Sequence, residues 1–156
     1  PFCIFRFFYA IIEINACKVE VIKLNLKENI NKSILLLKDF NIISVYLFGS
    51  AAKNQLKPES DIDIAFLSFL DVDEYECFMK AQELAEIFKR DVDLIDLKKA
   101  STVFKAQIIG TSSLIYCNDD VKRAYFEMRA LKEYALLNEE RAEIIKNIQK
   151  GDKIYG

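Results

Sequence analysis

"VYLFGSAAKNQLKPESDIDIAFL", residues 45–67, is the stretch that decides the fold, because it sets two aspartates inside an apolar, strand-like run. A charged side chain is rarely buried without a partner, so Asp61 and Asp63 require a physical reason. Side chains alternate along a strand, so both aspartates project from one face while Ile62 and Ile64 occupy the other. Their backbones lie about 6.6 Å apart, close enough for the two carboxylates to converge on one cation.

A bound divalent cation is the reason that the acidic pair suggests. Two ionised carboxylates about 4 Å apart repel by roughly 4 kcal/mol at an effective dielectric constant near 20, and a shared cation reverses that term. Asp93, in a later apolar run, completes a set of three, while Asp96 falls on the opposite strand face and Asp91 at the strand entrance. Hard oxygen donors without histidine or cysteine indicate Mg²⁺ or Mn²⁺ rather than zinc or copper.

A phosphate-binding turn is predicted directly before the acidic pair. Gly49 and Ser50 end the apolar run of residues 42–48, and Ser50 is predicted to be the N-cap of a short helix that begins "AAKN". Free backbone N–H groups and the helix dipole favour a phosphate there, and Gly49 lets the backbone approach it closely. Lys53, one turn further on, adds a positive charge.

The joint pattern carries more information than its parts. Gly-Ser alone and Asp-x-Asp alone are common, and they also occur as an ordinary turn and as water-facing carboxylates at a strand edge. Here an apolar strand, Gly-Ser, ten residues, Asp-x-Asp in a second strand and Asp93 in a third occur together. These parts are the ones needed to position a nucleoside triphosphate for attack at phosphorus.

Hydrophobic periodicity predicts an α/β domain, with a small mixed sheet flanked by helices. The expected helices are residues 26–40, 74–89 and 101–109, and the expected strands are residues 42–48, 61–67, 91–97 and 113–117. Cys77 falls on the apolar stripe of the helix 74–89 and is expected to be a core residue.

Three regions follow from this assignment. Residues 1–20 form an N-terminal extension, residues 21–117 the α/β core, and residues 118–156 a long charged helix or helix pair that opens with "NDD". The apolar anchors expected for this tail are Val121, Tyr125, Met128, Leu131, Ile144, Ile145 and Ile148. A helix laid on the domain is favoured over a dedicated partner-binding surface.

Composition excludes several classes of protein. The chain has 156 residues, 52% apolar and 29% charged, which suits a single folded domain. A net charge of −2 gives no basic face for nucleic acid, so no direct nucleic-acid contact is expected. The apolar stretch at residues 1–12 is interrupted by Arg6 and is too short to cross a bilayer, so no membrane contact is expected.

The absence of histidine is equally informative. It removes Ser-His and Cys-His nucleophile pairs and most zinc sites, so any catalysis depends on carboxylates, lysines or a metal. The four cysteines contain no C-x-x-C pair and no leader peptide is evident, which favours reduced thiols in a cytoplasmic protein.

The motif region resembles a known family. "LFGSAAKNQLKPESDIDIAFL" followed by "RDVDLIDL" is similar to the minimal nucleotidyltransferases (MNT) of the DNA polymerase β-like superfamily, with the Gly-Ser-x10-Asp-x-Asp spacing met without gaps. The arrangement is most similar to MNT antitoxins encoded beside HEPN ribonuclease toxins, and "RAYFEMRALKEY" in the tail is similar too. The resemblance covers roughly residues 21–137.

The resemblance implies a nucleotidyltransferase fold and an AMP-transferring antitoxin. Asp61 and Asp63 would hold two Mg²⁺ ions against the triphosphate of ATP, and Asp93 would complete the site. Gly49 and Ser50 would bind the phosphates. The acceptor would be a tyrosine of a cognate HEPN toxin, held in a hetero-oligomer and silenced by the transfer.

Three further points qualify the resemblance. Lys53 stands where such sequences commonly have arginine, and it lacks the planar fork of a guanidinium. An antitoxin that acts by binding alone, or a transferase for a small molecule such as an aminoglycoside, are the alternatives, although resistance enzymes usually carry a larger second domain. HEPN ribonucleases are expected to use an arginine-histidine motif, so a chain without histidine corresponds to the antitoxin.

Overall fold

The computed structural model describes residues 25–52 and 60–151. The expected N-terminal extension, Lys53 and the last five residues of the expected tail lie outside the described residues. Of the helices in the described part of the chain, none is both long and apolar enough to span a bilayer.

A four-stranded mixed sheet forms the centre of the fold, in the order β3-β2-β1-β4. Its strands are β1 (Ile42–Phe48), β2 (Ile62–Ser68), β3 (Val92–Asp96) and β4 (Ser113–Cys117). β1 pairs antiparallel with β2 and β4, whereas β2 and β3 run parallel. The mixed sheet predicted from the sequence is therefore confirmed, and each predicted strand lies within two residues of its observed bounds.

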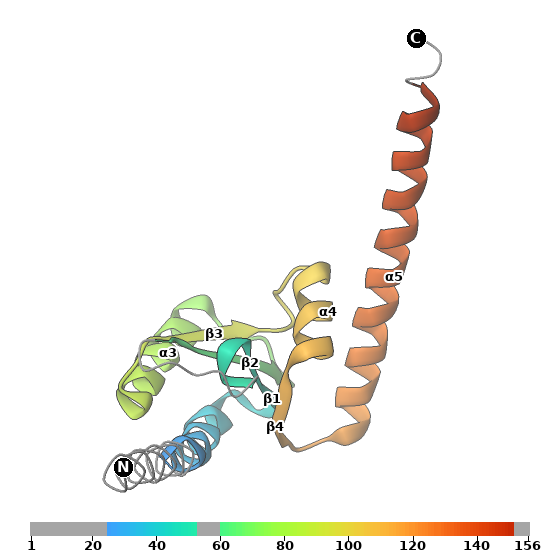
Figure 1. The fold of residues 1–156 in the computed structure, drawn as a ribbon. Helices are drawn as coiled ribbons and strands as arrows, with labels where there is room; N and C mark the ends of the chain where they lie inside the picture. The colour runs from blue at the N-terminus through green and yellow to red at the C-terminus, as the bar shows by residue number, and fades with distance from the viewer. Residues whose placement is uncertain (1–24, 53–59, 152–156) are drawn as a thin grey trace, which may run out of the picture.

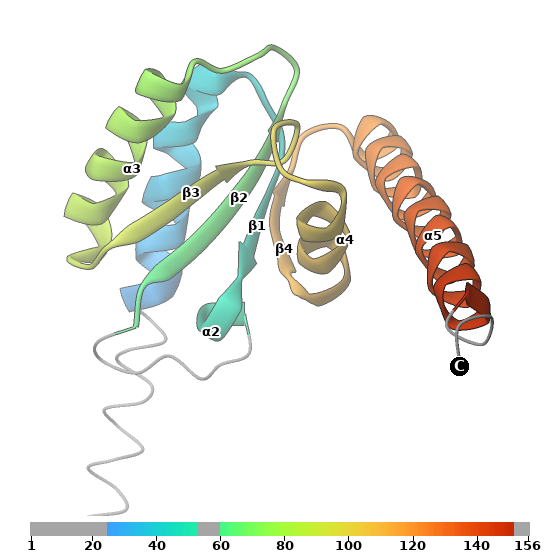
Figure 2. The ribbon, with the colours of Figure 1, turned by 90° about the horizontal axis from the view of Figure 1, so that it is seen from above.

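Helices cover both faces of this sheet. Residues 25–37 are helical and continue into the 3-10 turn η1 (Lys38–Phe40), which ends where Asn41 takes a left-handed conformation with φ 50°. The remaining helices are α2 (Gly49–Ala52), α3 (Glu74–Phe88), α4 (Thr102–Thr111) and α5 (Asp120–Gly151). Figure 2 shows the helix of residues 25–37 and α3 on one side of the sheet, with α4 and α5 on the other.

Each face of the sheet has its own hydrophobic cluster. The cluster under residues 25–37 and α3 includes Val45, Leu47, Ile62, Ile64, Phe66 and Leu84, with Cys77 packed against it as predicted. The cluster under α4 and α5 includes Ile43, Tyr46, Ala65, Leu67, Leu97 and Ile108, with Phe104 and Phe126 at its margin. Strand alternation thus sends β2 isoleucines to the first cluster and leaves Asp63 on the α4 side.

The prediction that Ser50 is the N-cap of a short helix is wrong. α2 begins at Gly49, so Ser50 is its second residue rather than its N-cap. Gly49 itself has a positive φ of 66°, a left-handed conformation at the point where the chain leaves β1 and enters α2.

The tail is one helix, and its predicted apolar anchors are wrong. α5 runs for 32 residues and extends beyond the sheet (Figure 1). All seven predicted anchors are exposed, from 45% for Leu131 to 80% for Val121. The helix instead packs through Phe126 and Ala130, while Val121 and Tyr125 line a pocket beside Phe126, together with Ile43 and Leu67 of the sheet.

A buried hydrogen-bond network fastens α5 to the sheet. The Tyr46 hydroxyl lies 2.7 Å from Glu127 Oε1, and Arg123 Nη1 donates to the same carboxylate at 3.0 Å. The Ser44 hydroxyl donates to the Tyr46 oxygen at 3.2 Å. Burial is the main cause that raises the pKa of Tyr46, so the phenol stays protonated and donates to Glu127.

Replacing Tyr46 with phenylalanine is expected to lower the free energy of unfolding by about 1–2 kcal/mol, because Glu127 loses a buried donor. Chemical denaturation followed by circular dichroism measures the change. Tyr75→Phe is the matched control, since Tyr75 is 69% exposed and should leave the free energy of unfolding within ~0.5 kcal/mol of the parent value. Equal effects of both substitutions would contradict the role assigned to the network.

Candidate active site

Two of the predicted acidic residues are brought side by side by the parallel pairing of β2 and β3. Asp63 is the direct register partner of Asp93, and Asp61 lies immediately before β2. Two residues further along these strands, Ala65 and Ile95 pack in the cluster beneath α4. By strand alternation, Asp63 and Asp93 therefore project from the same face of the sheet, as the sequence predicts.

The Gly-Ser turn packs directly on this acidic pair. Antiparallel pairing sets Phe48, the last residue of β1, opposite Asp63, so the chain enters α2 beside that carboxylate. A Cβ placed on Gly49 would overlap Asp63 Oδ2 and lie 2.9 Å from its Cγ. Only glycine fits this contact, and its φ of 66° also suits glycine best. The turn predicted to hold phosphate and the predicted metal ligand are thus in van der Waals contact.

The electrostatics of the site favour a cation. Partial burial raises the pKa of Asp63 above its ordinary value, and repulsion from Asp93 and then Asp61 raises it further. Within the described residues, no three acidic, cysteine or histidine side chains already form a group that could hold a metal ion. Mg²⁺ commonly binds through one or two carboxylates and completes its shell with water and substrate phosphates, so the oxygen donors present fit that ion.

The pH dependence of stability tests this repulsion. A raised folded-state pKa means that the stability from protonated Asp63 is complete below about pH 3.8 and is lost as the pH rises through the folded-state pKa. We expect Asp63→Asn to match the parent melting temperature near pH 4 and to exceed it increasingly towards pH 7 without divalent ions.

A second aspartate supplies the control for that experiment. Lys98 lowers the pKa of Asp71, so Asp71→Asn should lose stability relative to the parent as the pH rises. Addition of Mg²⁺ at pH 7 should raise the melting temperature of the parent more than that of Asp63→Asn. A pH-independent difference between Asp63→Asn and the parent would contradict the repulsion among the three carboxylates.

The two alternative carboxylates occupy other positions. Asp96 is 7% exposed and lies on the opposite face of β3 from Asp93, where its Oδ1 accepts a hydrogen bond from Lys98 N. Asp91 is exposed just before β3, and its carbonyl accepts from Ile62 N at 3.0 Å, which starts the pairing of β2 with β3. Asp93 is the member of the three that lies within β3 in direct register with Asp63.

Arg90 is a residue near the site that the sequence reasoning missed. Its Nη1 donates to the carbonyl of Ser60 at 3.4 Å, which ties the segment before Asp61 to the turn before β3. The available signal was the "RDVD" sequence, where a guanidinium directly precedes the acidic strand.

A glycine turn packed on paired carboxylates at one end of a mixed sheet defines a nucleotidyltransferase. The chain belongs to the polymerase beta nucleotidyltransferase family, whose model matches residues 28–121. Within that class the chain is similar to the protein adenylyltransferase MntA of Shewanella oneidensis, with 36% identity over 123 residues that cover 77% of this chain and 87% of MntA.

The chain is also similar to proteins in solved structures of toxin-antitoxin complexes. A toxin-antitoxin complex with AMP-PNP contains a chain that is 34% identical with a TM-score of 0.69, covering 78% of this chain and 98% of that one. The MNT antitoxin bound to a tri-AMPylated Shewanella oneidensis HEPN toxin gives 33% identity and a TM-score of 0.64, covering 78% of this chain and 96% of that chain. The nucleotidyltransferase fold expected from the sequence is therefore confirmed.

Proposed function

We propose that this protein is an antitoxin that transfers AMP from ATP to a tyrosine of a cognate HEPN-type ribonuclease toxin and thereby neutralises it. The observation that carries the proposal is the register pairing of Asp63 with Asp93 against the backbone of Gly49. The similarity to MntA, named as a protein adenylyltransferase, and to the MNT antitoxin of a tri-AMPylated toxin supports the same reaction. The reaction belongs in the cytoplasm, where ATP is available.

Each residue has a defined part in this reaction. Gly49 and Ser50 hold the phosphates with their backbone N–H groups, and Lys53 adds a positive charge. Asp61 and Asp63 would hold Mg²⁺, in two ions, and the metal when bound supplies positive charge to the phosphate oxygens. Asp93 accepts the proton of the tyrosine hydroxyl as its oxygen attacks the α-phosphorus.

The transfer balances without any further reactant. A bond forms between the tyrosine oxygen and the α-phosphorus, the bond from that phosphorus to the bridging oxygen breaks, and pyrophosphate leaves. The hydroxyl proton passes to Asp93 and then to solvent. The bulk and negative charge of the attached AMP are what silence the ribonuclease.

Labelled ATP tests the proposal directly. The protein, Mg²⁺ and a cognate HEPN-type toxin are incubated with ATP labelled at the α-phosphate or at the γ-phosphate. We expect only the α-label on a tyrosine of the toxin, with ribonuclease activity falling in proportion to labelling. Neutralisation of the toxin without any label would overturn the transfer and leave an antitoxin that acts by binding.

A further inference from the structure

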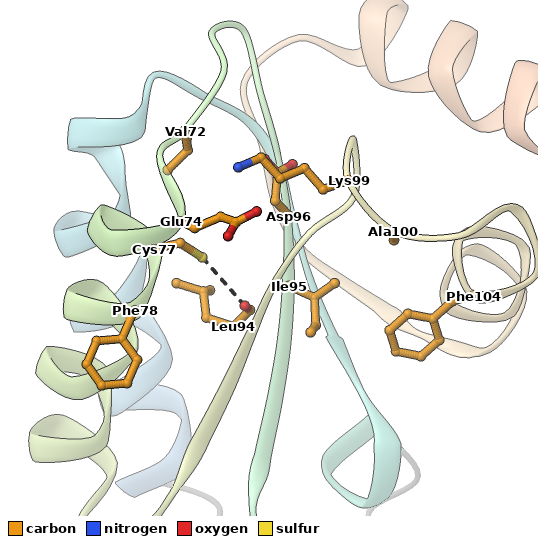
Figure 3. Close-up of a pocket in the computed structure, with 10 residues that line it drawn as sticks. All are labelled: Val72, Glu74, Cys77, Phe78, Leu94, Ile95, Asp96, Lys99, Ala100 and Phe104. Carbon is orange, nitrogen blue, oxygen red and sulfur yellow. Dashed lines mark hydrogen bonds between the residues drawn. The ribbon is translucent and has the colours of Figure 1, made fainter.

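A pocket of about 420 Å³ lies along the outer edge of β3, between α3 and α4. It is separate from the Gly49 turn and opens where β3 has no neighbouring strand among the described residues. Figure 3 shows its lining residues, which come from both helices and from the strand between them. Phe78 of α3 and Phe104 of α4 stand at opposite sides of it.

A buried, half-satisfied carboxylate lies in this pocket. Asp96 is 7% exposed, and its Oδ1 accepts a hydrogen bond from Lys98 N at 2.9 Å. Its Oδ2 is buried and has no hydrogen-bond partner in the described part of the chain. An unpartnered buried carboxylate oxygen destabilises a fold, so a positive charge placed in the pocket beside Asp96 would offset part of that cost.

The other charges in the pocket favour a cationic donor. The carboxylate of Glu74 points into the pocket from the first turn of α3, and Lys99 is the one positive side chain among the lining residues (Figure 3). Two carboxylates against one ammonium leave a net negative charge. The apolar walls from Val72, Phe78 and Leu94 suit the methylene stem of a long side chain.

The outer edge of β3 pairs with no other strand of the described chain, although the Asp96 carbonyl at its end already accepts hydrogen bonds from Lys99 N and Ala100 N. Leu97 N donates to the carbonyl of Phe66, so the parallel ladder uses the backbone groups of Ile95 and Leu97 and turns those of Leu94 outward. The outward carbonyl of Leu94 accepts a long contact of 3.6 Å from the Cys77 thiol, a weak donor that a peptide N–H can replace. An extended segment could therefore add to β3 as a further strand.

We propose that this pocket binds a lysine or arginine side chain of the protein acceptor, carried on an extended segment that pairs with the edge of β3. The cation lies against the negative charge of Glu74 and of the buried Asp96 carboxylate, while its stem lies against the apolar walls. Asp93 is three residues back along the same strand, about 10 Å away, so the docked segment approaches the reacting end of the sheet. This inference rests on the proposed transfer to a protein.

Three substitutions test the pocket, and each has a reason to fold. Asp96→Asn keeps the acceptor for Lys98 N and removes the buried charge, so its melting temperature should equal or exceed that of the parent. Glu74→Gln and Glu74→Lys alter an exposed side chain. Glu76→Gln and Glu76→Lys are the matched controls, because Glu76 is also exposed in the first turn of α3 and does not line the pocket.

The steady-state readout separates docking from chemistry. We expect Asp96→Asn and Glu74→Gln to raise KM for the HEPN acceptor about tenfold, and Glu74→Lys about a hundredfold, with KM for ATP and kcat at saturating acceptor unchanged. Both Glu76 variants should keep the acceptor KM of the parent. An unchanged acceptor KM in the Asp96 and Glu74 variants, or an equal rise in KM for ATP, would overturn the proposal.

A binding experiment keeps this result separate from the proposed function. The Kd of parent and variants for the HEPN protein is measured by calorimetry, which requires no transfer. Alkylation of Cys77 by iodoacetamide, followed by mass spectrometry, should slow at least tenfold when the acceptor is bound, because the thiol lines the pocket. If the parent labels no acceptor, the proposed function fails; if Kd and Cys77 alkylation do not respond, the pocket proposal fails.

Discussion

Replacing Asp61 and Asp63 together with asparagine should lower AMP transfer by about 10³-fold or more, because the substitution removes the charges that hold a divalent cation against the triphosphate. Initial rates with α-labelled ATP and the HEPN acceptor measure the loss. The fold should survive, because asparagine has nearly the same volume and the change relieves the repulsion that raises the pKa of Asp63.

The control for this variant removes the same number of charges elsewhere. Asp39 and Asp71 have side chains that are 72% and 92% exposed, and each forms a surface ion pair with a lysine. Asp39→Asn with Asp71→Asn should therefore leave transfer near the parent rate. If the Asp61 and Asp63 double variant still neutralises the toxin fully at matched expression, transfer is not what silences the ribonuclease.

Replacing Gly49 with alanine should reduce transfer by about 10²-fold or more, because the new methyl group overlaps Asp63 Oδ2 and displaces that carboxylate. The left-handed backbone at this position adds about 1–2 kcal/mol of destabilisation for a residue with a side chain. Transfer rates and chemical denaturation measure the two effects separately.

Gly110 provides the matched control within the same chain. A Cβ built there has no neighbour within 4 Å, and the residue lies in α4, where alanine is favoured over glycine by about 1 kcal/mol. Gly110→Ala should keep the parent transfer rate and match or exceed the parent melting temperature. Equal activity of Gly49→Ala and Gly110→Ala would show that the contact with Asp63 does not matter for the reaction.

The sequence predicted the parts of this protein that depend on local pattern. A continuous apolar run predicted the buried strand β1, and alternation predicted β2 with its acidic face. Strand parity also predicted that Asp96 lies on the opposite face of β3 from Asp93. Those assignments depend only on the alternation of side chains along a strand and on where each apolar stretch of sequence ends. The direct register of Asp63 with Asp93 is a property of the assembled sheet, and the sequence alone leaves it open.

The failures of sequence reasoning have tertiary causes. Val121 and Met128 are apolar like Phe126 but are exposed, so the composition of α5 does not say which stripe meets the sheet. The hydrogen bond from Tyr46 to Glu127 selects the orientation, and it joins residues 81 positions apart. The pocket at the β3 edge was missed for the same reason, because it exists only once α3 and α4 stand on either side of the strand.

The last part of α5 shapes how the molecule moves through water. Side chains 138–149 are all exposed, and a helix of 32 residues is about 48 Å long at 1.5 Å per residue. An 18.1 kDa particle with such a projection should sediment more slowly than a compact sphere of equal mass. A partner that lies along this segment adds mass without adding length, so the frictional ratio should fall as the complex forms.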